Sequence, residues 1–254
     1  MKVAIVGYGR MGRLISSLLI DKGNELVAVI DPVSSSDAVT DKVLDAKAVM
    51  DADVVIDFSS PQSAVDNIIM YAKLGVPAVI GTTGWYEAKD RISDLCKENE
   101  SKVIYSGNYS LGVAVFLKLA RKAGELINRV GAYDVSVREV HHTGKADSPS
   151  GTALMIAEEL ISSIDSKREV LIGNSDGRIR SDQLQIVSER VGRVPGIHEI
   201  LIDGDYDSIT LTHSARSREG FASGAIAAAE WLIKTDKSGL LSMDDFLDDL
   251  LGDL

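Results

Sequence analysis

Cysteine occurs once in the 254 residues of this chain, as Cys96. One cysteine excludes a disulfide within the chain and a metal site made of cysteines alone, and it favours a reducing compartment, so we expect a cytoplasmic protein. Cys96 follows Ile92 and Leu95 on one face of an expected helix. We therefore expect it to be a small core residue and not a nucleophile.

Long apolar runs are also missing from the sequence. No stretch approaches the roughly 18 apolar residues that a membrane-spanning helix requires, so we expect no membrane association. The apolar start, Val3 to Val6, is followed at once by a glycine turn. This pattern predicts a first β-strand and not a signal peptide.

Positive charge is in deficit, with 27 Lys and Arg against 38 Asp and Glu and a net charge of −11. This balance excludes nucleic-acid binding driven by bulk charge, because a phosphate backbone requires a basic surface. It also repels small anions, so an anionic substrate would need a local cluster of cations. The 45% hydrophobic content is typical of a globular protein, here of one or two domains.

The first half of the chain alternates short apolar runs with segments of helical period. This alternation is typical of a parallel sheet whose strands are joined by crossover helices. The expected strands are 3–6, 26–30, 54–58, 76–80 and 102–105, and the expected helices include 61–74 and 86–99.

The pattern changes after residue 110, where turn residues separate most of the expected strands. Strict polar and apolar alternation in 133–138 indicates a sheet with one face on a core, in antiparallel or mixed pairing. This region predicts a second domain of a different kind. Its expected strands are 133–138, 183–189, 198–202 and 208–213, its expected helix is 149–164, and a further helix, 221–234, and an acidic C-terminal helix follow.

A glycine-rich turn links the first strand to the first helix. Gly7-Tyr-Gly-Arg-Met-Gly12 fits G-x-G-x-x-G, and Asp31 ends the second strand. This context predicts a dinucleotide site, with the pyrophosphate at the helix start and the adenosine ribose on Asp31. Because a carboxylate repels a 2′-phosphate, we expect NADH to be preferred over NADPH, although Arg10 and Arg13 oppose this preference. The candidate cofactor residues here are Gly7, Tyr8, Gly9, Arg10, Met11, Gly12 and Asp31.

Two further segments follow the carboxyl ends of expected strands, where open α/β sheets bind ligands. Both offer hydroxyls, amides and glycines, and we expect them to line the nicotinamide half of the cofactor. They are equally compatible with ordinary turns in which Thr83 or Ser110 caps a helix. The candidate residues are Gly81, Thr82, Thr83, Ser106, Gly107, Asn108 and Tyr109.

The densest group of polar residues runs from Glu139 to Thr152. His141 and His142 are neighbours on an extended strand, so we expect their side chains to point in opposite directions and to do different jobs. Lys145 and the helix start at Ser150 to Thr152 together predict a site for a carboxylate. We expect no metal, because adjacent histidines on a strand cannot readily chelate one ion.

These segments resemble the 4-hydroxy-tetrahydrodipicolinate reductase (dihydrodipicolinate reductase) family along nearly the whole chain. The most specific element is the His-His-x-x-Lys-x-Asp-x-Pro-Ser-Gly-Thr run, and the nucleotide fingerprint is the least specific. The other matching segments are 54–59, 81–84, 108–113 and 209–221.

The resemblance implies a Rossmann-type parallel-sheet domain from residues 1–110 and 219–254. It also implies an α+β domain with an open mixed sheet from residues 111–218, which binds substrate and forms a homotetramer. The implied reaction reduces the cyclic product of dihydrodipicolinate synthase, a small dicarboxylate, to tetrahydrodipicolinate with NADH or NADPH, in diaminopimelate and lysine biosynthesis.

The resemblance also assigns roles to residues of the polar run. It implies that His141 is a general acid or base and Lys145 a second proton donor. It makes His142 a substrate ligand and gives the grip on a substrate carboxylate to Gly151 and Thr152, beside Ser150. Hydride delivery to a conjugated imine leaves an enamine that must be protonated, and a histidine beside a lysine can do this.

Two alternatives come from other classes of protein. One is another two-domain nicotinamide oxidoreductase, such as an amino-acid dehydrogenase. The other is a non-catalytic dinucleotide sensor, which needs the glycine turn but has no use for the residues between His141 and Thr152. We expect His198 and His213 to be structural. Arg216 and Arg218 lie near the return to the first domain, and the sequence is compatible with contact to the cofactor or with a bridge between the domains.

Overall fold

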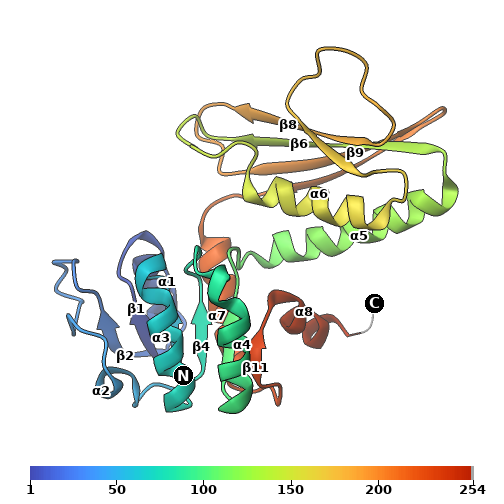
Figure 1. Ribbon diagram of the computed structural model, residues 1–254. Coiled ribbons are helices and arrows are strands. Elements are labelled where there is room, and N and C mark those ends of the chain that lie inside the picture. Colours follow the sequence, from blue (N-terminus) through green and yellow to red (C-terminus); the bar gives the residue numbers. More distant parts are fainter. Residues whose placement is uncertain (253–254) are drawn as a thin grey trace. The chain divides into compact units, whose positions relative to one another are not determined.

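The computed structural model describes residues 1–252, so Asp253 and Leu254, at the end of the expected acidic tail, lie outside the described residues. The chain forms two compact units. Unit 1 consists of Met1–Leu111 and Glu219–Leu254, and unit 2 consists of Gly112–Arg218. Each unit has its own sheet (Figure 1). The expected fold class, a Rossmann-type parallel sheet plus a second unit with a mixed sheet, is confirmed.

The sheet of unit 1 has six strands in the order β11-β5-β4-β3-β1-β2, and every pair is parallel. The carboxyl ends of these strands therefore lie along one edge of the sheet. The strands are β1 (Lys2–Val6), β2 (Glu25–Ile30), β3 (Val54–Asp57), β4 (Ala78–Ile80), β5 (Lys102–Tyr105) and β11 (Gly239–Leu241).

Helices cover both faces of this sheet (Figure 1). Alternate strand residues enter two separate cores: Ile5 and Ile56 pack with α1 and α7, and Val6 and Val55 pack with α3 and α4. Burial on both faces explains why these strands are apolar without alternation. The helices are α1 (Arg10–Asp21), α2 (Ala46–Val49), α3 (Pro61–Leu74), α4 (Lys89–Glu98), α7 (Glu219–Leu232) and α8 (Met243–Leu251), with a 3-10 turn at Tyr86–Ala88.

The sheet of unit 2 has five strands in the order β10-β9-β6-β8-β7 and is mixed. β6 pairs parallel with β8 and antiparallel with β9. Helices α5 and α6 lie on the same face of this sheet (Figure 1). The elements are α5 (Leu111–Val130), β6 (Tyr133–His141), α6 (Gly151–Ser163), β7 (Glu169–Ile172), β8 (Gln183–Arg190), β9 (Ile197–Gly204) and β10 (Ser208–Ser214).

Along β6, the buried face of this sheet changes from apolar to polar residues. Val137 of β6 lies opposite Ile186 and Ile200, and all three are buried in the core under α5 and α6. Two residues further along β6, on the same face, Glu139 lies opposite Ser188 and His198. The polar residues of the expected site therefore begin where the core ends, as the period of two in a strand requires.

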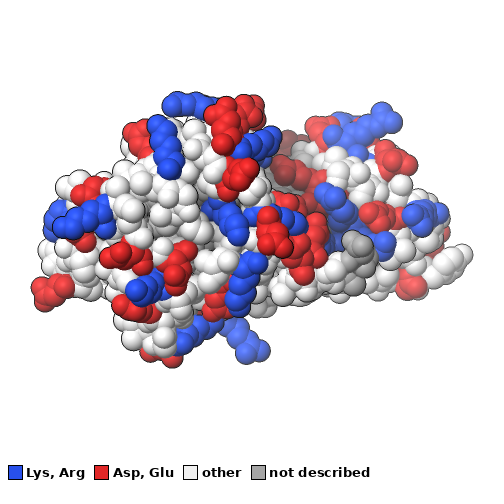
Figure 2. Space-filling view, turned by 90° about the horizontal axis from the view of Figure 1, so that it is seen from below, with Lys and Arg blue, Asp and Glu red and all other residues white. Residues whose placement is uncertain are grey.

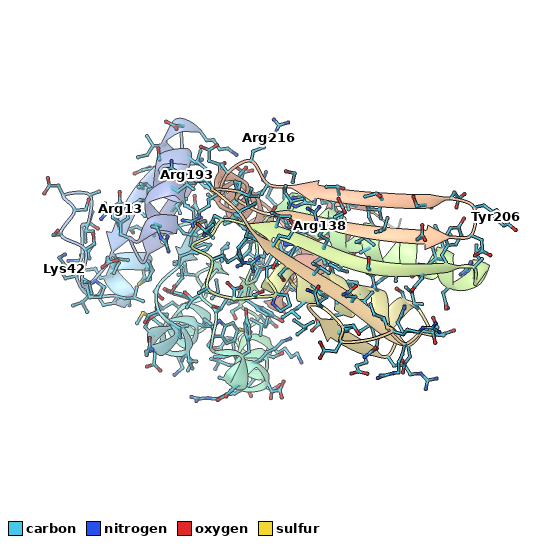
Figure 3. The ribbon with its side chains drawn as sticks, turned by 90° about the horizontal axis from the view of Figure 1, so that it is seen from above. Arg13, Lys42, Arg138, Arg193, Tyr206 and Arg216 are labelled. Carbon is cyan, nitrogen blue, oxygen red and sulfur yellow. The ribbon has the colours of Figure 1, made fainter. Side chains whose placement is uncertain are left out.

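The other face of this sheet carries charged and apolar side chains together. Arg138 forms ion pairs with Glu189 at 2.7 Å and Glu199 at 3.8 Å (Figure 3). Leu201 is exposed on the same face. Over the surface seen in Figure 2, basic and acidic side chains are interspersed. Within residues 1–252, no helix is long and apolar enough to cross a membrane.

Candidate functional site

The glycine turn after β1 has three glycines with different surroundings. Gly7 has a φ of 87°, and a Cβ there would lie 2.3 Å from the Phe58 carbonyl oxygen. A Cβ at Gly12 would lie 2.0 Å from the carbonyl oxygen of Gly7, so both positions require glycine for close packing. At Gly9, by contrast, a Cβ would meet no atom of the described chain within 4 Å.

Gly9 is the N-cap of α1 and has no side chain with which to cap it. The first turn of α1 therefore begins beside open space. Its backbone amides, at Arg10, Met11 and Gly12, can donate hydrogen bonds to a phosphate there. The residues present fit the pyrophosphate of a dinucleotide.

Asp31, at the end of β2, is held by three backbone amides. Its Oδ2 accepts from Tyr8 N at 2.7 Å, and its Oδ1 accepts from Val33 N at 2.8 Å and Ser34 N at 2.7 Å. Burial would raise the pKa of this carboxyl, but the amides outweigh burial and hold the pKa below its ordinary value. Asp31 is therefore ionised. Its Oδ2 accepts a hydrogen bond from Tyr8 N and can accept a second one, for example from a ribose hydroxyl.

Two cations lie close to this carboxylate. Arg13 donates to the carbonyl of Tyr8 at 3.2 Å and to the Ser34 hydroxyl at 3.4 Å, and its guanidinium lies over the Tyr8 ring. Lys42 donates to the carbonyl of Ser34. Figure 3 shows Arg13 and Lys42 at the same end of unit 1. Arg10, which the sequence also offers as a cation, is exposed in the first turn of α1.

The loop after β4 holds Gly81, Thr82 and Thr83 next to the end of β3. A Cβ at Gly81 would lie 2.1 Å from the ring of Phe58, so this glycine is required for packing. Thr82 is buried, whereas Thr83 is exposed. Of the two hydroxyls, that of Thr83 is the one accessible to a ligand.

The loop after β5 holds Ser106, Gly107, Asn108 and Tyr109. The Ser106 hydroxyl donates to the carbonyl of Asn108 at 2.8 Å, and Gly107 is exposed. Tyr109 is buried, with its hydroxyl 3.0 Å from the carbonyls of both Ile80 and Ile104. Its side chain joins the ends of β4 and β5, so only its backbone can face a cofactor.

A buried carboxylate that sequence reasoning missed supports these loops. Asp57 ends β3 and is fully buried. It accepts hydrogen bonds from the Tyr71 hydroxyl at 2.8 Å, from Asn67 Nδ2 at 2.9 Å and from the Thr82 hydroxyl at 3.3 Å. The available signal is a carboxylate that ends an otherwise apolar strand, Val54–Asp57.

In unit 2, His141 is the last residue of β6 and is buried. Its Nδ1 is hydrogen-bonded to Oε2 of Glu139, which is fully buried. His142 lies beyond the end of β6 and is half-buried. Nε2 of His141 faces Gly196, where an added Cβ would lie 3.0 Å away. The two histidines therefore have different surroundings.

Glu139 also contacts β8 and the start of α6. Its Oε1 accepts from Arg190 Nη2 at 2.8 Å and from Ser150 N at 3.3 Å. The same Arg190 nitrogen donates to the carbonyl of Asp147 at 2.8 Å. Burial would raise the pKa of Glu139, but its hydrogen bonds with Arg190 and His141 outweigh burial and keep the pKa below its ordinary value.

His198 and His213 come from β9 and β10 and join this cluster. The rings of His141 and His198 are 5.2 Å apart edge to face, and those of His198 and His213 are 6.3 Å apart. His198 Nε2 is 3.0 Å from the Ser150 hydroxyl, which caps α6 by accepting from Ala153 N. Burial, with a smaller effect from the charge of His141, lowers the pKa of His198 to about 4. His198 is therefore neutral near pH 7.

The expected carboxylate site lies at the start of α6. Gly151 is exposed, and within residues 1–252 a Cβ added there would meet nothing within 4 Å. Thr152 is half-buried in the first turn. Lys145 Nζ is 2.7 Å and 2.9 Å from the two carboxylate oxygens of Asp147, which is exposed. An incoming carboxylate must therefore compete with Asp147 for Lys145.

The structure brings His141, Lys145 and Ser150 into one unit with three residues that sequence reasoning gave no site role, Glu139, Arg190 and His198. Unit 2 thus presents an imidazole nitrogen, a lysine and an open helix start. Unit 1 presents the glycine turn, Asp31 and the two loops. Arg216 and Arg218 are exposed. Among residues 1–252, no three His, Cys, Asp or Glu side chains are placed to hold a metal ion.

Comparison with known proteins gives matches along nearly the whole chain. Residues 1–109 match the family model described as dihydrodipicolinate reductase, N-terminus, and residues 112–247 match the model of its C-terminus. A 4-hydroxy-tetrahydrodipicolinate reductase from Christiangramia forsetii is 36% identical, with 98% of this chain and 99% of that protein covered. The enzyme of the same name from Archaeoglobus fulgidus is 35% identical, with 98% and 100% covered.

A solved structure shares the fold of the described chain. It is the dipicolinate-bound dihydrodipicolinate reductase from Paenisporosarcina sp. TG-14, with a TM-score of 0.78 and 24% identity. The match covers 95% of this chain and 97% of that one.

Proposed function

The chain belongs to the dihydrodipicolinate reductase family, and from this premise we propose how its residues carry out the reaction. The protein is an oxidoreductase that reduces 4-hydroxy-tetrahydrodipicolinate, with loss of water, to tetrahydrodipicolinate in diaminopimelate and lysine biosynthesis. The observation that carries the proposed division of roles is the buried cluster at the end of β6, where Nδ1 of His141 is bonded to Glu139 and Nε2 is left for substrate.

We propose that unit 1 binds the nicotinamide cofactor, which supplies the hydride when bound. The amides of Arg10, Met11 and Gly12 would hold the pyrophosphate beside Gly9, where the backbone leaves open space. Asp31 would accept from a ribose hydroxyl. The exposed Thr83 hydroxyl and the backbone of Ser106–Tyr109 would orient the nicotinamide.

We infer that NADH is preferred over NADPH. The support is the ionised Asp31, which three amides fix at the end of β2 and which would repel a 2′-phosphate. Arg13 and Lys42 lie nearby, but both already bond the 31–36 loop. Because their positive charges would partly offset the repulsion of a 2′-phosphate by Asp31, we expect the preference for NADH over NADPH to be moderate and not absolute.

We propose that His141 is the general acid. Hydride addition to the conjugated imine of the substrate leaves an electron-rich enamine carbon, and Nε2 of His141 donates the proton that this carbon takes. His141 then regains a proton from water. A positioned general acid contributes about 10²–10⁴-fold to a rate.

We propose that the substrate is held as a dicarboxylate in unit 2. One carboxylate would accept from the amides of Gly151 and Thr152 at the start of α6, and Lys145 would leave Asp147 to pair with it. His142 would bind a second polar group of the substrate. The bound dipicolinate of the Paenisporosarcina relative is a dicarboxylate of this class. Lys145, whose charge acts on His141, would serve as a second proton donor.

We further propose a homotetramer in the cytoplasm. The face of the unit 2 sheet opposite α5 and α6 carries Leu201, which is 41% exposed, among the ion pairs of Arg138. Contact with other copies would cover this face. Light scattering of the purified protein should give four times the chain mass, and a monomer at working concentration would refute this part.

A coupled assay tests the cofactor preference. A synthase forms the substrate from pyruvate and aspartate semialdehyde, and the loss of NADH or NADPH absorbance is followed separately. We expect a higher kcat/KM with NADH. Asp31→Asn should narrow the difference in kcat/KM between NADH and NADPH. Asp37→Asn, which makes the same charge change at an exposed position just beyond the 31–36 loop, should not. Better use of NADPH by the unaltered protein would contradict the inference.

A further inference from the structure

The buried carboxylate of Glu139 has no role of its own in the division of roles above, although it is bonded to His141. It is fully buried, yet it contacts three different elements: His141 on β6, Arg190 on β8 and the amide of Ser150 at the start of α6. A buried ionised group is costly unless it is paired and hydrogen-bonded. Here each carboxylate oxygen has a partner.

The bond from Glu139 determines which nitrogen of His141 carries which proton. An ionised carboxylate has no proton to give and can only accept, so His141 must donate through Nδ1–H. Arg190, 2.8 Å from the other oxygen, favours the ionised form of Glu139. Nε2 is then the nitrogen that gains and loses a proton, and it lies close to Gly196, where an added Cβ would be 3.0 Å away.

We propose that Glu139 is a positioning residue for proton transfer, which fixes His141 in the Nδ1–H form and stabilises its protonated state, while Arg190 holds Glu139 in place. This proposal rests on the assignment of His141 as the general acid. Proton donation moves one proton from Nε2 to the substrate carbon and leaves neutral Nδ1–H imidazole, and a proton from water restores the starting form.

The charges around His141 oppose one another. Burial lowers the pKa of His141, and the positive charges of Lys145, from the loop after β6, and Arg190, from β8, lower it further. Glu139 raises it. His198, on β9, is neutral near pH 7 and adds no charge there. Glu139 is therefore the group whose charge favours the imidazolium of His141 against burial and the two cations.

The test is the pH profile of kcat in Glu139→Gln. Glutamine keeps the size and one acceptor oxygen but removes the charge, so the falling high-pH limb should move to lower pH by at least about one unit. At a pH above this limb, kcat of the variant should be about tenfold below that of the unaltered protein for each unit by which the limb has moved. The reason is that the protonated fraction of His141 falls in the same ratio. KM should change little. Glu189→Gln, which removes an exposed carboxylate that also pairs with an arginine, should leave the profile unchanged.

A double variant separates this proposal from the assignment of His141. If Glu139 acts through His141, adding Glu139→Gln to His141→Gln should reduce kcat by less than about twofold more. If the losses of the two single variants multiply in the double variant, Glu139 does not act through His141. That result would overturn the role of Glu139 and leave the role of His141 intact. Full activity of His141→Gln would instead overturn the general acid.

Nitrogen NMR of the unaltered protein provides a measurement that does not depend on any variant folding. With ¹⁵N-labelled histidine, and His141 assigned by its loss in His141→Gln, we expect Nδ1 to carry the proton in the neutral ring. A neutral His141 protonated at Nε2 would contradict the proposal.

Discussion

His198 should make the stability of the protein strongly dependent on pH. It is buried beneath His141 with a pKa of about 4, against an ordinary value of 6.5. The unfolded chain therefore takes up a proton below pH 6.5, whereas folded His198 stays neutral until about pH 4. Because the unfolded state binds more protons in this range, stability is lost as the pH falls from 6.5 towards 4.

The size of this loss follows from the difference between the two pKa values. One unit corresponds to about 1.4 kcal/mol, so the full effect is about 3.4 kcal/mol, which is approached only below the folded pKa of about 4. At about pH 5 the contribution is about 2 kcal/mol, and at about pH 7.5 it is close to zero. Burial also lowers the pKa values of His141 and His213, which adds to the loss in the same direction.

Urea unfolding at about pH 7.5 and pH 5 measures the effect. Both tryptophans, Trp85 and Trp231, lie in unit 1, so far-ultraviolet circular dichroism is the better probe of unit 2. The unaltered protein should lose about 2 kcal/mol more than His198→Gln or His198→Met between the two pH values. The two variants pack differently but both lack a titrating group, so they should agree with each other. Equal losses in all three proteins would refute a neutral buried His198.

Three further variants test other parts of the structure. Gly151→Ala places a methyl group in the open space at the start of α6, so KM should rise about tenfold while the melting temperature does not fall. An unchanged KM would show that the substrate does not bind at this helix start. Tyr71→Phe leaves buried Asp57 without one donor, and denaturant unfolding should show a loss of about 1–3 kcal/mol; a loss near zero would mean that the bond is replaced. Lys145→Ala should raise KM in steady-state kinetics because it removes the cation for a substrate carboxylate; a lowered kcat at constant KM would show proton donation instead.

Much of unit 1 could be predicted because its signals are local. The helix α3 begins at Pro61 after Ser60 and ends before Gly75, which has a φ of 68°, as the sequence indicates. Cys96 is buried in the core, as expected. The short strand β11, Gly239–Leu241, was missed because three residues carry no period, and it is held by its pairing with β5.

The same contrast between local and distant contacts explains the site. His141, Lys145 and Ser150 lie within one polar run, so their spacing alone predicted a shared role. Arg190 and His198 lie far along the chain and reach Glu139 and Ser150 only through the register of the mixed sheet. We expected His198 to be structural, and its contacts with Ser150 and the ring of His141 place it beneath the site.

The most direct test of the central claim is the turnover of His141→Gln under saturating substrate and cofactor. If Nε2 of His141 delivers the proton, kcat should fall about 10²–10⁴-fold, while the Kd for NADH, which unit 1 would bind, stays near that of the unaltered protein. A variant that keeps full kcat would show that the proton comes from elsewhere and would contradict the account.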